Sequence, residues 1–327
     1  MKKSLLTPVI ALLSAALLLS GCQVRLDTPD PEELVPDAAE QARSGAVADS
    51  LAIAAAADYL LSSPDDVLAP VLMAISAESA QHVEALGGVY ESGLPTPEAD
   101  EEESPAPEPA LGSDATVDSL IADLQAAAET NFTVALSQDS AEQFHLYGAI
   151  GVAQAVAADR LTVMTGGEVS EIGPAVFPST VSVPESTRDS LILAEDQLGY
   201  LYEFLAARSG ISPQDSSDEV VASAAALRAQ LLGLSRIHTD RAEQWAAAGN
   251  ISNTVADPRE ATYALPTEVD EASIPHADAL LADLVPIYSL HAFQASADQR
   301  EVSLDLWLLI SLEASRTGSE LGAFPGR

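Results

Sequence analysis

The feature that most constrains the fold is the unequal spacing of eight amphipathic segments along the chain. Each segment repeats its apolar residues with a period near 3.6, which is typical of a helix with one buried face. In each half of the chain, fewer than ten residues separate the first segment from the second and the third from the fourth, whereas more than twenty separate the second from the third. The predicted helices are 38–61, 65–86, 116–137 and 140–163, then 189–208, 217–248, 276–296 and 300–321.

This spacing predicts a particular kind of helical bundle. A short turn joins antiparallel neighbours, whereas a long connection carries the chain along the whole bundle before the third helix begins. A four-helix bundle with one long crossover in its middle has the ferritin-like topology. A composition rich in Ala and Leu, with only 5% aromatic residues, also favours helix over sheet. We therefore expect an all-α fold of two tandem ferritin-like four-helix bundles, each with a long crossover between helices two and three.

The two halves also align with each other without a gap. Residues 118–161 pair with residues 278–321 at a constant offset, and Ala-Asp-Leu at 122–124 then meets Ala-Asp-Leu at 282–284. Identity is low, so the alignment suggests a duplication and does not establish one.

The N-terminus has the pattern of a lipoprotein signal peptide, predicted to span residues 1–21. Lys2 and Lys3 form a positive region, and an apolar run at 8–19 is too short for a membrane span. The run ends in Leu-Ser-Gly-Cys, which resembles the bacterial lipobox, with Cys22 as the acylated residue. Cys22 is also the only cysteine, so no disulfide can form within the chain. We expect acylated Cys22 to hold the protein in a lipid bilayer, on the extracytoplasmic face of the cell membrane.

The remaining chain divides by composition. Residues 22–37 are predicted to be a flexible stalk, 38–163 a first and degenerate bundle, 164–188 a linker, and 189–327 a second bundle. Within the first crossover, the acidic and Pro-rich run 98–109 is expected to be a solvated loop, although cation binding by this run stays open.

The charge balance excludes one class of partner. The formal net charge is −36, and loss of Lys2 and Lys3 with the signal peptide would make it −38, since −36 − 2 = −38. Such a chain is repelled by phosphate backbones, so no nucleic-acid binding is expected. The sequence also has no Gly-rich phosphate loop, no Gly-x-Ser-x-Gly motif and no second cysteine, and no catalytic residue is predicted.

Polar residues on the apolar faces of the second half are the main site candidates. We expect Glu195, His238 and His291 to point inward, and Arg241 and Tyr288 stand one turn from the two histidines. One interpretation is a structural Glu–His–Arg–Tyr network, in which Arg241 neutralises Glu195 in a buried pair. The other is a mononuclear or partial site for iron or manganese.

Di-iron bundles need more carboxylates than this half supplies. They use one Glu on each of two helices and Glu-x-x-His on the other two. Here Ser235 precedes His238 by three residues, Tyr288 precedes His291 by three, and Glu313 lies only at the edge of its apolar face. No cofactor is therefore expected, with iron or manganese as the alternative.

The first half has a weaker polar set, for which a satisfied core cluster is the preferred interpretation. Amides can satisfy hydrogen bonds in a core but bind iron poorly. On the helical pattern Asp58 also faces inward, whereas His145 faces outward. The cluster consists of Glu78, His82, Asn131 and Gln154.

One set of residues in the second half carries a family resemblance: Ala194-Glu195-Asp196, Tyr200 to Arg208, His238, Arg241, Trp245, Trp307 and Phe324-Pro325-Gly326. With these residues, the second half resembles a ferritin-like family of unknown function found in lipoproteins and secreted proteins of actinobacteria. The resemblance covers about 189–327, with a weaker echo over 38–161. It implies a fold and a location in the cell envelope, and it brings no established reaction.

Three functions remain open on the sequence. The preferred hypothesis is a membrane-anchored envelope lipoprotein that acts as a non-enzymatic binding or scaffold protein. The alternative is a metal-binding protein or metal-dependent oxidoreductase that uses the second bundle. A third hypothesis, a substrate-binding lipoprotein, predicts a two-lobed fold that contains sheet.

Overall fold

The computed structural model describes residues 36–62, 66–89, 114–169, 175–209, 218–264 and 273–327, except for the side chains of 219, 220 and 273–276. Within these ranges the chain forms eight α-helices, one short 3-10 helix (η1, Ala297–Gln299) and no strand, which argues against the two-lobed sheet fold. The helices are α2 (Ala38–Leu61), α3 (Ala69–Ala85), α4 (Val117–Ser137), α5 (Ala141–Met164), α6 (Glu185–Arg208), α7 (Asp218–Ala248), α8 (Ser273–Gln294) and α9 (Arg300–Arg316).

Local capping chemistry explains where several helices begin. The Asp37 carboxylate accepts the Glu40 N–H at 2.8 Å ahead of α2. Thr116 and Ser119 form a reciprocal capping box at the start of α4, and the Ser140 hydroxyl accepts the Gln143 N–H ahead of α5. These side chains satisfy backbone donors that have no partner within the first helical turn.

The end of α9 differs from the prediction. Helix α9 ends at Arg316, whereas the apolar pattern predicts helix up to residue 321. Gly318 adopts a φ of +96°, and the Ser319 N–H then donates to the Ala314 carbonyl at 3.1 Å. This left-handed residue stops the helix because it turns the chain back over the last carbonyls. The residues beyond the helix, 317–327, form a C-terminal segment of turns and bends.

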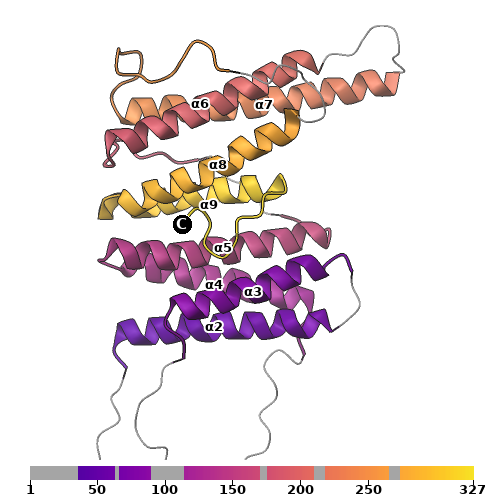
Figure 1. Cartoon of the computed structure of the whole chain (residues 1–327), viewed down its shortest axis with the longest axis vertical. Helices are drawn as coiled ribbons and strands as arrows, with labels where there is room; N and C mark the ends of the chain where they lie inside the picture. The colour runs from indigo at the N-terminus through magenta and orange to yellow at the C-terminus, as the bar shows by residue number, and fades with distance from the viewer. Residues whose placement is uncertain (1–35, 63–65, 90–113, 170–174, 210–217, 265–272) are drawn as a thin grey trace, which may run out of the picture.

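Sequence neighbours pack as helical hairpins, stacked along the long axis of the molecule (Figure 1). The pairs are α2 with α3, α4 with α5, α6 with α7 and α8 with α9. Between the pairs, α2 contacts α4, α3 contacts α5, and α6 contacts α8. Within the described ranges, neither α3 with α4 nor α7 with α8 forms a comparable contact.

The two halves meet through α5, which packs against both α8 and α9 (Figure 1). One cluster of buried apolar side chains therefore runs from α2 to α9. Gly148 permits the close approach, since a Cβ at this position would lie 3.3 Å from side-chain atoms of Leu304 and Trp307. The halves thus share a core in addition to their own packing.

Two sequence predictions about polar residues are wrong. His145 is buried, its Nε2 lies 2.8 Å from the Ser289 hydroxyl, and its ring stacks on Trp307 with centroids 5.1 Å apart. The helical pattern places this residue outward because it considers one buried face, whereas α5 buries a second face against the other half. Asp58, predicted to face inward, is exposed because α2 leaves that side uncovered.

The C-terminal segment returns across the junction of the two halves. The Ala323 carbonyl lies 2.7 Å from Nε2 of His82 on α3. Gly326 has a φ of +74°, and a Cβ there would lie 2.7 Å from the Cα of Pro286 on α8. The segment thus contacts both halves, and Gly326 is required by both its backbone angle and its space.

Part of the predicted linker also packs on the second half. The Phe177 ring meets Trp245 edge to face with centroids 5.1 Å apart, and the Val181 N–H donates to the Ala248 carbonyl at 3.3 Å. Residues before α6 therefore pack against α7 and contribute to the core of the second half.

Helix α2 is the one described helix that is long and apolar enough to cross a membrane, on length and composition alone. It packs against α3 and α4. The predicted signal peptide, Cys22, most of the stalk and the acidic run 98–109 lie outside the described residues.

Candidate functional site

Glu195 is the centre of a buried polar network in the second half. Its side chain on α6 is 0% exposed. One carboxylate oxygen, Oε1, accepts the Tyr288 hydroxyl of α8 at 2.5 Å, and the other, Oε2, lies 2.6 Å from Nδ1 of His238 on α7. Three helices thus bring together Glu195, His238 and Tyr288, and both carboxylate oxygens have a partner within the protein.

Aromatic neighbours extend this network. The Trp245 indole N–H donates to the Tyr288 hydroxyl at 3.1 Å, and the Tyr202 ring stacks on His238 with centroids 5.5 Å apart. Burial and the Glu195 charge raise the pKa of Tyr288 well above its usual value. Tyr288 therefore keeps its proton and stays a donor to the carboxylate. The helical pattern of the sequence alone does not identify this hydrogen bond of Trp245.

Arg241 pairs with a different residue from the one predicted. Its guanidinium donates to both oxygens of Glu313 on α9, from Nη1 at 2.7 Å and from Nη2 at 2.6 Å. Burial lowers the pKa of Arg241, but the hydrogen bonds and charge of Glu313 outweigh burial and raise that pKa above its usual value. The predicted direct pair with Glu195 is not formed, because Arg241 pairs with Glu313 of α9 and both Glu195 oxygens bond other groups. The Glu195 charge still adds to the raised pKa of Arg241. Glu313 lies at the edge of an apolar face, and the sequence also contains an inward-facing Arg241. These two features together could have indicated that Glu313 is the partner of Arg241.

His291 lies beside the network without joining its hydrogen bonds. The ring is fully buried against Trp245, edge to face, with centroids 4.7 Å apart. Neither ring nitrogen has a hydrogen-bond partner among the described groups. Burial lowers the pKa of His291 to about 4, so the ring is neutral at pH 7.

These residues do not fit a di-iron or di-manganese centre. Both Glu195 oxygens are engaged by protein groups, and Glu313 is held by the Arg241 cation. Ser235 and Tyr288 occupy the positions where Glu-x-x-His would supply bridging carboxylates. In the part of the chain that the structure describes, no three His, Cys, Asp or Glu side chains are grouped to hold a metal ion. The arrangement can hold a proton-bearing polar network inside an apolar core, which is a structural role.

The first-half candidates separate into two places. Asn131 on α4 donates from Nδ2 to Oε1 of Gln154 on α5 at 2.8 Å. Asn131 Oδ1 and Gln154 Nε2 are buried without a hydrogen-bond partner among the described groups, so the expected satisfied cluster is only partly formed. His82 instead contacts the C-terminal segment at Ala323. Glu78, one turn before His82, is largely buried, and this burial raises its pKa to about 6. The four residues therefore do not form the predicted single cluster. Asn131 and Gln154 pair with each other, whereas His82 and Glu78 of α3 lie beside the C-terminal segment.

Comparisons with protein-family models, with curated proteins and with solved structures found no match for this chain. The resemblance to a ferritin-like family therefore stays a prediction, and the assignment of a role depends on the chain's own residues.

Proposed function

We propose that the protein is an extracytoplasmic, membrane-anchored lipoprotein that acts as a non-enzymatic binding or scaffold protein, built on two tandem ferritin-like bundles. The anchor in this proposal is the lipid on Cys22, and the helical body stands on the stalk at 22–37. The proposal gives the body no reaction of its own.

The contacts between helices support the bundle assignment. In each half the first helix contacts both the second and the third, as α2 does with α3 and α4, and α6 with α7 and α8. A simple up-and-down bundle would instead pair the second helix with the third, and the described residues show no substantial contact of that kind. A long crossover between the second and third helices produces the observed neighbours.

The observation that carries the non-enzymatic assignment is the closure of the Glu195 network. A reactive or metal-binding carboxylate needs an oxygen that is open to its substrate or ion. Both oxygens of Glu195 are 2.5–2.6 Å from groups of the same chain, and the side chain is fully buried. Such a network orders helices α6, α7 and α8 relative to one another.

Metal analysis tests this assignment. The purified protein is loaded anaerobically with Fe(II) or Mn(II), desalted and measured for bound metal. We expect well below one metal ion per chain, with no change in Glu195→Ala or His238→Ala. Near-stoichiometric metal that both substitutions abolish would refute the scaffold assignment and favour the metal-binding alternative.

A second experiment tests the anchor separately. Wild-type protein and Cys22→Ser are produced in a host with lipoprotein processing, and each is partitioned between Triton X-114 and water. We expect wild type in the detergent phase with incorporated palmitate, and the variant without palmitate. Wild-type protein without a lipid would overturn the lipoprotein assignment and leave the non-enzymatic assignment to the metal test.

A further inference from the structure

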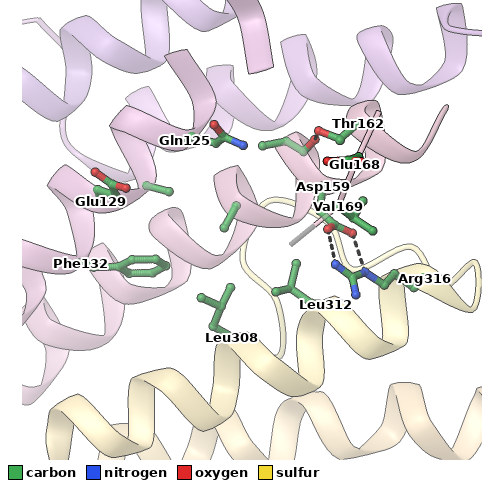
Figure 2. A pocket seen from close by; sticks show the side chains of 13 residues that line it. Gln125, Glu129, Phe132, Asp159, Thr162, Glu168, Val169, Leu308, Leu312 and Arg316 are labelled. Atoms are coloured by element: carbon green, nitrogen blue, oxygen red, sulfur yellow. Dashed lines mark hydrogen bonds and ion pairs between the residues drawn. The ribbon is translucent and has the colours of Figure 1, made fainter. Parts of the chain in front are cut away.

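A groove opens where the two halves meet, between α4, α5 and α9. It encloses about 440 Å³. Pockets of about 300–1,000 Å³ are typical of small-molecule sites. Figure 2 shows Glu129 and Phe132 toward one end, and Asp159, Arg316 and Glu168 toward the other. The groove lies outside the Glu195 network, which is enclosed by the second half.

Apolar side chains form about half of the groove lining. Leu308 and Leu312 of α9 form one side, and Phe132 of α4 stands across from them (Figure 2). These three side chains are half-buried, so each offers apolar surface to a ligand. Alanine side chains of α4 and α5 line the space as well, and they keep it open because they are small. An alkyl or aromatic body therefore has surface on which to pack.

The groove lining carries more negative than positive charge. Arg316 donates to Asp159 from Nε at 3.0 Å and from Nη2 at 2.6 Å, so this cation is already engaged by a carboxylate. Glu129 and Glu168 are exposed at the groove, and the described residues include no hydrogen-bond or ion-pair partner for either carboxylate. The lining therefore has three carboxylates and one cation, a net formal charge of −2.

We propose that this groove binds a small organic ammonium, with its apolar body against Phe132, Leu308 and Leu312 and its charged end at Glu129 or Glu168. Carboxylates next to apolar walls attract an amphipathic cation, and the same carboxylates repel organic acids and phosphates. An anionic ligand would have to displace Asp159 from Arg316. The groove gives the proposed binding role a ligand class, and in that respect this inference rests on the proposed function.

Three probes with a phenyl body test the charge requirement: 2-phenylethylamine, 2-phenylethanol and 3-phenylpropionate. Methylamine, which has the charge without the body, tests the apolar walls. The full-length protein is titrated by ligand-observed NMR under one buffer and detergent. We expect 2-phenylethylamine to bind with a Kd on the order of millimolar, as its few heavy atoms permit. The other three probes should bind at least about threefold more weakly, because each lacks one of the two contributions.

Two double variants of equal net charge locate the binding. Glu129→Gln with Glu168→Gln removes both groove carboxylates, while Glu84→Gln with Glu203→Gln removes two exposed carboxylates elsewhere. We expect the groove variant to weaken amine binding at least about threefold and the control to leave it within error. Equal weakening in both variants, tighter binding of 3-phenylpropionate, or no amine binding would overturn the proposal. None of these results bears on lipid attachment or metal content, so the two failures are distinguishable.

Discussion

Replacing Tyr288 with Phe removes one oxygen atom from the centre of the second half. That hydroxyl donates to the Glu195 carboxylate at 2.5 Å and accepts the Trp245 N–H at 3.1 Å. All three side chains are 0% exposed, so water does not replace the lost partner. A hydrogen bond to a charged group contributes about 1.5–3 kcal/mol, and a buried donor left without a partner costs about 1–3 kcal/mol. We expect Tyr288→Phe to lower the free energy of unfolding by about 3–5 kcal/mol.

Urea unfolding measures this loss. Circular dichroism follows the helices, and tryptophan fluorescence follows the second half, because Trp245 and Trp307 are the only tryptophans. The matched control is Tyr147→Phe on α5, a buried tyrosine whose hydroxyl has no hydrogen bond among the described groups. We expect the control to change the unfolding free energy by less than about 0.5 kcal/mol. A loss below about 1 kcal/mol for Tyr288→Phe, or equal losses for both variants, would refute a network in which this hydroxyl is essential.

Three further substitutions test other parts of the structure. Burial lowers the pKa of His291 from 6.5 to about 4, so protons bind the unfolded chain first as pH falls through this window. Wild type should therefore lose about 3 kcal/mol of stability that His291→Phe does not lose, measured by urea unfolding at pH 7 and pH 4. Burial raises the pKa of Glu78 from 4.5 to about 6, so the folded state carries a charge at pH 7 at a cost. Glu78→Gln should stabilise the protein by about 2 kcal/mol at pH 7, and thermal unfolding should show this gain shrinking between pH 6 and 4.5. Gly326→Ala places a Cβ 2.7 Å from the Pro286 Cα at a positive φ, so the C-terminal segment should detach and trypsin should cleave faster after Arg316. Unchanged cleavage would show that the segment does not need a glycine there.

The helices themselves could be predicted because their signals are local. Apolar residues at a 3.6-residue period mark each buried face, and Asp37, Thr116 and Ser140 mark three starts. The overrun at the end of α9 came from reading the apolar pattern past Gly318, whose left-handed conformation stops the helix.

The inward polar residues were predictable for the same reason, but their partners were not. The periodicity of α6, α7 and α8 places Glu195, His238 and Tyr288 on apolar faces, and the structure joins these three by hydrogen bonds. The partner of Arg241 depended on how α9 lies against α7. The apolar pattern of a helix does not say which other helix packs against it. Glu313 was therefore not predicted as the partner of Arg241.

The sequence by itself determined the all-helical character, the approximate helix bounds and the inward position of polar residues such as Glu195, His238 and His291, since period and capping depend on residues a few positions apart. The packing of α5 against α8 and α9 was decided only in three dimensions. That contact buries His145 and places the groove beside Arg316. The physical reason is that an apolar helix face indicates that the face is buried, but not which element packs against it. In addition, an Ala- and Gly-rich helix such as α5 can be covered on two sides.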